Sequence, residues 1–423
     1  MSPRPVFPAN AETVPDGARL RGLIAVNGVS TLAQIVQIGA IAPLLSFVLS
    51  ARGVEPGAIG VFSTAPWLMI LAVSRTVPRL IARLGLVASV GGSVVLSAGA
   101  IALMPVVESI WALFVLNLVV GFGLIVRWIA CDTWIVRIAS DAGRGRAIGI
   151  HETMMGLGIA IGPMLLALVG VEGWPPFALC VGLLLAGLIP LAATRGWDGK
   201  PGVPADARSG RALVGLLATA LTAAFVCGFV ETASIALLPV YAGGLGLAAA
   251  AGALLVGAFG TGGTVLQMPL GWLADAIGFR RSQILCAAVI LLGAGAVPAT
   301  FALAGEAAGL PWILLPWIVL FVWGGAVGGL NTLAVIEAGA RVDAERTSAA
   351  MTLIALAYTL GSIAGPAASG VAIERVSVHG LMITAGVMAT AFLLLGLVTG
   401  RRGAADEAEE RATGGSGGGG ADD

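Results

Sequence analysis

The sequence predicts an all-α membrane protein with twelve transmembrane helices, and three observations carry this prediction. Hydrophobic residues make up 58% of the 423 residues, charged residues only 11%, and the mean hydropathy is +0.98, which excludes an ordinary soluble domain. The apolar runs are continuous rather than alternating, which favours helices over the strands of a membrane barrel. One span takes roughly 20 apolar residues, so the chain has room for about a dozen.

The predicted spans form two sets of six, separated by a polar segment rich in Pro and Gly. Such a segment is typical of a connection between two halves. The Gly-rich C-terminal run is typical of disordered tails and of engineered linkers. We therefore expect an N-terminal segment (1–21), an N-terminal six-helix half (22–193), a linker (194–211), a C-terminal six-helix half (212–400) and a disordered tail (401–423). The spans are expected at 22–50, 57–77, 86–105, 110–136, 147–170, 175–193, 212–241, 248–270, 282–303, 311–337, 347–373 and 378–400.

Basic residues are concentrated in alternate connections, which predicts the orientation of the chain. Loops rich in Lys and Arg stay in the cytoplasm, so both termini, the linker and the tail are expected there. The N-terminal segment has no apolar core and does not resemble a signal peptide. The basic residues of these connections include Arg79, Arg83, Arg144, Arg146, Lys200, Arg280, Arg281, Arg341 and Arg346.

An internal repeat relates the two sets of spans. PRLIARLGL (78–86), between spans two and three, aligns with the loop between spans eight and nine when it is moved by 193 residues, so that Gly85 falls on Gly278. GIAIGPML (158–165) in span five matches GSIAGPAA (361–368) in span eleven. Two halves with the same internal order indicate parallel repeats.

The loop GWLADAIGFRR (271–281) resembles the signature loop of the major facilitator superfamily. This resemblance implies that superfamily's fold, two pseudo-symmetric six-helix halves, and membership of its twelve-helix bacterial branch in the cytoplasmic membrane. It also implies a gating role for the loop. The matching positions are Gly271, Asp275, Gly278, Arg280 and Arg281, and the first-half copy keeps Arg83 and Gly85.

We expect Asp275 to cap a following helical turn or to pair with Arg280 and Arg281, and so to fasten one half to the other on the cytoplasmic side. The alternative is a tight turn whose arginines only follow the charge rule for cytoplasmic loops.

Span five also resembles a signature associated with antiporters of the superfamily, which favours export. The closing Gly pair of that signature is absent here, where Leu166 and Ala167 stand. Close helix packing around small residues, with a bend at proline, explains the same residues equally well. The motif comprises Gly149, Gly158, Gly162 and Pro163, with Gly361, Gly365 and Pro366 in span eleven.

Two ionisable residues lie deep within predicted spans. A charge at the bilayer centre is costly, so it faces water or a partner. Glu231, expected somewhat beyond the midplane, is a candidate proton carrier or counter-charge for a cationic substrate; the alternative is a neutral structural acid.

Arg127 is the second, a candidate partner for an acid or for a substrate anion. Five residues rotate it away from Asp132, so we expect it to approach Glu152 or Glu231 instead; the alternative is an aqueous cavity. Further candidates for proton or substrate binding, for which solvation or helix packing is the alternative, are Asp132, Glu152, His151, Gln34, Gln37 and Asn331.

The motifs exclude most enzyme classes. The sequence has no phosphate-binding loop followed by lysine, no nucleophile elbow and no His/Glu metal pair at helical spacing. We therefore expect no catalysis, metal, cofactor or nucleic-acid partner. The sequence favours a monomeric secondary active transporter in the lipid bilayer that exports a small organic molecule in exchange for H+. Proton-coupled uptake and a transporter-like membrane sensor or scaffold are the alternatives.

Overall fold

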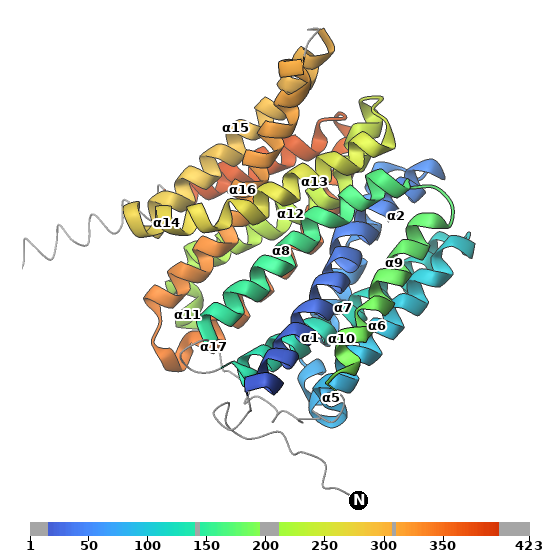
Figure 1. The fold of residues 1–423 in the computed structure, drawn as a ribbon. Coiled ribbons are helices and arrows are strands. Elements are labelled where there is room, and N and C mark those ends of the chain that lie inside the picture. Colours follow the sequence, from blue (N-terminus) through green and yellow to red (C-terminus); the bar gives the residue numbers. More distant parts are fainter. Residues whose placement is uncertain (1–15, 140–143, 195–210, 307–309, 397–423) are drawn as a thin grey trace, which may run out of the picture.

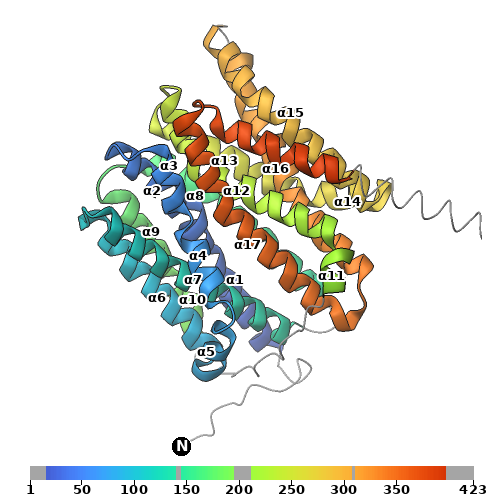
Figure 2. The same cartoon turned by 180° about the vertical axis from the view of Figure 1, so that it is seen from behind.

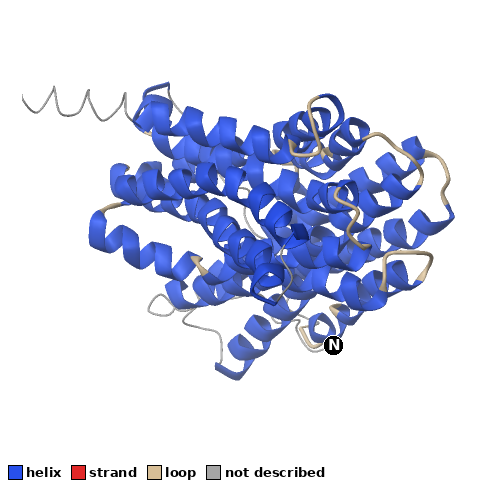
Figure 3. Ribbon diagram, turned by 90° about the horizontal axis from the view of Figure 1, so that it is seen from above, coloured by secondary structure: helices blue, strands red, loops and turns tan. Residues whose placement is uncertain are grey.

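The computed structural model describes residues 16–139, 144–194, 211–306 and 310–396, and within these ranges every regular element is a helix (Figures 1 and 3). The all-α prediction is confirmed, whereas the predicted tail and nearly all of the linker lie outside these ranges. The first half contains α1 (Asp16–Gln34), the π-helix η2 (Ile35–Ala40), α2 (Ile41–Ala51), α3 (Pro56–Ser63), α4 (Ala65–Val73), α5 (Val77–Leu84), α6 (Leu86–Leu103), the 3-10 turn η3 (Met104–Val106), α7 (Ile110–Ile138), α8 (Arg144–Val169), α9 (Pro175–Ala186) and α10 (Leu188–Ala192). The second half contains α11 (Arg211–Leu216), α12 (Ala218–Gly244), α13 (Ala249–Val265), α14 (Gln267–Ile277), α15 (Phe279–Glu306), α16 (Leu310–Arg341), α17 (Ala344–Arg375) and an unlabelled last helix (Gly380–Gly396).

These helices coincide with the predicted spans to within several residues. Among the described residues, ten helical segments are long and apolar enough to cross a membrane, and α13 with α14, bent by 41° at their junction, makes an eleventh. The twelfth predicted span corresponds to Gly380–Gly396, which is apolar but shorter than the others. The chain is therefore a multi-pass membrane protein with up to eleven full-length spans in the described ranges.

The predicted loop repeat is present in the backbone. Gly85 ends α5 and precedes α6 with φ 91°, and Gly278 ends α14 and precedes α15 with φ 87°. A residue with a side chain resists this left-handed region, at a cost of roughly 1–2 kcal/mol. In both halves, therefore, a glycine with positive φ joins a short helix to the long helix that follows it.

The motif glycines of spans five and eleven also allow close helix packing in both halves. A Cβ on Gly162 of α8 would collide with the backbone of Gly39 in η2. A Cβ on Gly361 or Gly365 of α17 would collide with the backbone of α12. The motif thus allows span five to touch span one, and span eleven to touch span seven, which supports the packing interpretation of these glycines. Gly158 also abuts η2, Gly149 faces open space, and Pro163 and Pro366 lie inside α8 and α17.

The two halves touch most extensively through α3 with α17 and α8 with α13, and further through α2 with α12 and α4 with α17. We call the end of the bundle where α1 begins the N-terminal end. At the opposite end, a Cβ on Gly60 of α3 would collide with the carbonyl oxygen of Pro366. These contacts reach the middle of α8, where a Cβ on Gly156 would lie 2.9 Å from the Thr264 side chain. Towards the N-terminal end the ribbons of the halves separate (Figure 2).

Candidate functional site

Glu231 lies at the midpoint of its helix. It is the thirteenth residue after Ala218 and the thirteenth before Gly244, the two ends of α12. This helix starts after a break at Leu217 and continues three residues past the predicted span, and the depth predicted for Glu231, somewhat beyond the midplane, stays a prediction. Ionisable groups near the middle of a membrane-spanning helix are costly to charge.

The Glu231 carboxyl is half-buried and is held by neutral donors. Tyr358 of α17 donates its hydroxyl to Oε2 over 2.8 Å, and the Cys227 thiol, one turn earlier on α12, donates to the same oxygen over 3.5 Å. The Tyr358 ring packs edge-on against Trp67 of α4, with centroids 5.6 Å apart. Side chains from both halves therefore meet at Tyr358, which donates to the acid. Among the described residues, no cationic side chain lies within ion-pair distance of Glu231.

Asn331 of α16 adds a second polar group beside this cluster. Its backbone lies next to the Cys227 thiol. Its side-chain Oδ1 is buried and accepts no hydrogen bond from any described residue. An unpaired amide oxygen in an apolar interior is a group that a ligand donor can satisfy.

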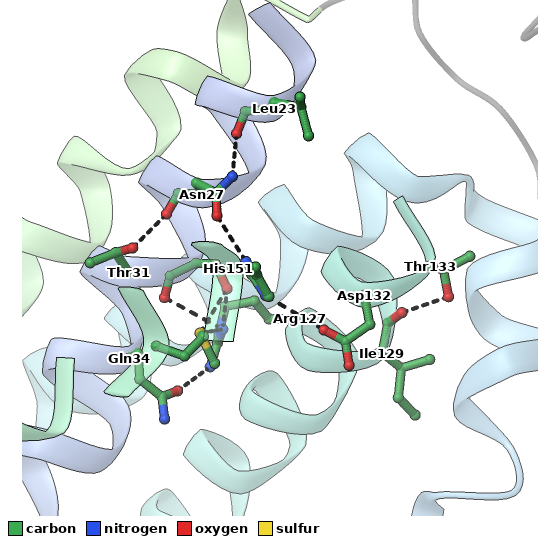
Figure 4. A network of polar contacts seen from close by, with 11 residues as sticks. Leu23, Asn27, Thr31, Gln34, Arg127, Ile129, Asp132, Thr133 and His151 are labelled. Carbon is green, nitrogen blue, oxygen red and sulfur yellow. Dashed lines mark hydrogen bonds and ion pairs between the residues drawn. The ribbon is translucent and has the colours of Figure 1, made fainter. Parts of the chain in front are cut away.

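Arg127 is fully buried, and neutral groups of the first span surround it. Its Nε donates to Gln37 Oε1 over 2.9 Å. Its Nη2 donates to Gln34 Oε1 over 2.8 Å (Figure 4). Its Nη1 donates to the Ser30 hydroxyl over 2.8 Å. Gln37 in turn donates to Ser97 over 2.8 Å. Each of the three guanidinium nitrogens thus donates a hydrogen bond to a neutral acceptor, and none donates to an acid.

The expectation that Arg127 approaches Glu152 or Glu231 is wrong. Ser30, Gln34 and Gln37 follow one another at four and three residues, so they line one face of the first span, and that face packs against α7. The nearest acceptors are therefore amide and hydroxyl oxygens. Gln34 and Gln37 hold the arginine and are buried with it.

A chain of three side chains runs beside Arg127 (Figure 4). The Nδ1 atom of His151 on α8 lies 3.1 Å from Asn27 Oδ1 on α1, and its Nε2 lies 3.5 Å from Asp132 Oδ1 on α7. His151 is buried with 3% of its side chain exposed, whereas Asp132 is 45% exposed. Glu152 is exposed and makes no hydrogen bond or ion pair with another described residue.

The gating loop makes its described contacts inside its own half. Arg280 donates from Nη2 to the carbonyl of Gly396 over 2.9 Å, at the end of the last helix, where the helix dipole favours a cation. Asp275 is exposed, and no hydrogen bond or ion pair joins it to another described residue. The expected pairing of Asp275 with Arg280 and Arg281, and the fastening of the halves by Asp275, are thus absent among the described residues. Gly271, Arg281 and Arg83 have open or exposed surroundings.

Sequence reasoning missed a contact that does join the halves. Glu374, near the end of α17, accepts a hydrogen bond from the backbone N–H of Gly57 over 3.1 Å. Gly57 lies in the first turn of α3, whose own N-cap residue, Glu55, makes no side-chain cap. A carboxylate from the second half therefore caps a helix of the first. The two residues are 317 positions apart in the sequence, so no local sequence pattern could predict this contact.

Sequence comparison agrees with this architecture. The family model of the Major Facilitator Superfamily matches residues 28–247 and 220–417. The uncharacterized MFS-type transporter YfkF of Bacillus subtilis (strain 168) is 27% identical over 360 residues, which cover 82% of this chain and 86% of that protein. The uncharacterized MFS-type transporter YcaD of Escherichia coli (strain SE11) is 25% identical over 290 residues, 67% of this chain and 72% of that protein.

Solved transporter structures share the fold at lower identity. A bacterial homologue of the human lysosomal transporter Spinster, in an inward-facing and unoccupied conformation, superposes with a TM-score of 0.68 and 14% identity, covering 90% of this chain and 96% of that one. The nucleoside transporter NupG gives a TM-score of 0.67 and 13% identity, covering 90% and 98%. These likenesses support the arrangement of the helices.

Proposed function

This chain belongs to the Major Facilitator Superfamily of membrane transporters, and we propose that it exports a small organic molecule in exchange for protons, with Glu231 as the proton-binding group. The observation that carries the proposal is the environment of that acid. It lies at the midpoint of α12, half-buried, with Oε2 held by Tyr358 and Cys227 and with no cation beside it among the described residues.

Exchange follows from the cost of charge at this depth. An ionised carboxyl at the bilayer centre costs roughly 2.5–3.5 kcal/mol on insertion scales. Either a proton or a hydrogen-bond donor on the substrate reduces that cost at Glu231. Both use the same carboxyl, so the binding of one disfavours the binding of the other. Competition at a single site reachable alternately from each side yields antiport.

The surroundings of Glu231 suit a substrate with an apolar body and a polar or cationic group. Trp67 and Tyr358 supply aromatic surface, and the unpaired Asn331 oxygen supplies an acceptor near the acid. Binding sites for small molecules combine such apolar walls with few polar groups. We propose that these residues contact the substrate.

The positions of the contacts between halves support access to Glu231 from the N-terminal end. They extend from the opposite end to the level of Gly156, near the middle of α8. The basic loops lie at the N-terminal end, so we propose that this end faces the cytoplasm of a bacterial cell. In that orientation the structure is an inward-facing state with its outer half closed.

Transport in proteoliposomes under an imposed pH gradient tests the proposal. Compounds that raise the thermal stability of the protein are first selected from a library and then assayed for flux. We expect wild type to move the selected compound against the proton gradient, and Glu231→Gln to bind it with flux unchanged by the gradient. Glu172→Gln, an exposed acid outside the spans, is the matched control and keeps wild-type coupling.

Three results would contradict the proposal. Gradient coupling in Glu231→Gln equal to that of wild type eliminates Glu231 as the proton site. Accumulation in the direction of the proton flow replaces export with uptake. Binding without flux under either gradient indicates a sensor rather than a transporter.

A further inference from the structure

We propose that His151 is a second proton-binding site, in the N-terminal half, at which Nε2 takes up a proton and then pairs with Asp132. The site lies on different helices from Glu231, and the inference does not require Glu231 to carry protons. It rests on the arrangement of Asn27, His151 and Asp132 (Figure 4).

The orientation of the Asn27 amide determines which nitrogen of His151 carries the proton in the neutral ring. Asn27 Nδ2 donates to the carbonyl of Leu23, one turn earlier, over 2.8 Å. This bond turns Oδ1, which can only accept, towards His151 Nδ1 at 3.1 Å. Nδ1 must therefore be the donor, because an acceptor cannot face an acceptor. The neutral imidazole is then protonated on Nδ1.

Nε2 consequently bears the free lone pair. It is buried and has no hydrogen-bond partner among the described residues. The nearest acid oxygen, Asp132 Oδ1, is 3.5 Å away, just beyond a good hydrogen bond. Two acceptors facing one another gain nothing, but a proton on Nε2 turns the same pair into a donor and an acceptor with opposite charges.

The remaining charged groups around His151 are few. On α7, Arg127 lies near Asp132 and disfavours a second cation, but its guanidinium is turned to Ser30, Gln34 and Gln37. The Cys131 thiol lies near Arg127, Asp132 and Ser30. On α8, Glu152 is exposed and adds negative charge beside the ring. On α1 the residue in contact with His151 is the neutral Asn27, and Arg19 lies about two turns nearer the start of that helix. Neither η2 nor α13 carries a charged residue.

Asp132 also provides a route for the proton. Its side chain is 45% exposed while His151 is buried, so protons reach Nε2 through the carboxylate. His151 lies seven residues into α8 from Arg144, about 10 Å along the axis at 1.5 Å per residue. The site is therefore nearer the N-terminal end than Glu231, on the side where the halves separate.

Nuclear magnetic resonance of histidine-labelled protein tests this directly. The chain has two histidines, and His379→Gln assigns the signals by removing one of them. The full-length protein in nanodiscs is titrated between about pH 5 and 8, the range in which histidine changes charge. We expect neutral His151 to carry its proton on Nδ1, and the protonated form to appear as the pH falls.

Two substitutions make the test specific. Asp132→Asn should lower the ratio of protonated to neutral His151 at a given pH, because it removes the carboxylate with which the protonated ring pairs. Asn27→Ala should release the neutral ring to carry its proton on Nε2. Glu172→Gln is the control and leaves both quantities unchanged.

Three results would overturn the inference: a neutral wild-type ring protonated on Nε2, a ring that stays neutral across the whole range in folded protein, or a ratio that Asp132→Asn leaves unchanged. The measurement needs no substrate and no flux. It is therefore decided independently of the proposed export.

Discussion

Replacing Gly60 with alanine should shift the protein away from the state described here. The new Cβ would collide with the carbonyl oxygen of Pro366, lie 2.9 Å from its carbon, and lie 3.2 Å from the Cα of Gly370. These are backbone atoms, so α3 and α17 must move apart, and such overpacking costs about 1–3 kcal/mol. The contact joins the two halves, so a state in which α3 and α17 are separated escapes this cost. A cost of that size changes the ratio of two states by about 5- to 150-fold.

Pulsed electron paramagnetic resonance measures the shift. Spin labels at Glu55→Cys and Val376→Cys, both exposed at the opposite end, report the separation of α3 from α17, and the four native cysteines are buried. We expect Gly60→Ala to increase the population at long distance. Gly92→Ala, where a Cβ meets nothing within 4 Å, is the control. A folded Gly60→Ala protein with the distance distribution of the control would refute the reasoning.

Two further substitutions separate stability from conformational balance. Arg127→Lys keeps the charge but loses the planar fork that serves three acceptors, so it should destabilise the protein by about 1–3 kcal/mol in thermal unfolding; exposed Arg146→Lys should not, and unchanged stability with lost ligand binding would instead indicate a substrate-binding arginine. Glu374→Ala removes the cap that α17 provides to α3, worth about 0.5–2 kcal/mol, so it should lengthen the distance across the opposite end; an unchanged distribution would show that the hydrogen bond does not hold the halves.

The spans and the repeat could be predicted because both depend only on which residues follow one another along the chain. Apolar runs of sufficient length mark helices wherever the solvent is lipid. The pairing of Gly85 with Gly278 marks a turn that the backbone reaches only with glycine. Neither inference needs to know which helix neighbours which. The structure confirms the repeat and the all-helical spans, of which ten or eleven are full-length in the described ranges.

The partners of Arg127 could not be derived from depth alone. The position of Arg127 along α7 fixes its height in the helix bundle, and several spans have polar side chains at that height. The choice among them depends on which helix faces which. Gln34 and Gln37 were recognisable as a polar face of the first span, but the sequence leaves open whether such a face lines a cavity or meets a neighbour. In the structure α1 and η2 pack against α7, so the polar face that carries Gln34 and Gln37 meets Arg127.

The two deep charges are satisfied to different degrees, and this difference explains why a transport role is proposed for only one of them. Arg127 has a neutral acceptor for Nε, Nη1 and Nη2, all from its own half, so displacing it would leave several buried oxygens unpaired. Glu231 receives both of its described hydrogen bonds on Oε2, and one comes from a tyrosine that touches the other half. A ligand that donates to Oε1 breaks no existing bond. We therefore expect movement of α4 relative to α17 to alter the packing of Tyr358 against Trp67 and its hydrogen bond to Glu231. The occupancy of Glu231 and the relative position of the halves would then be coupled through the Tyr358 ring.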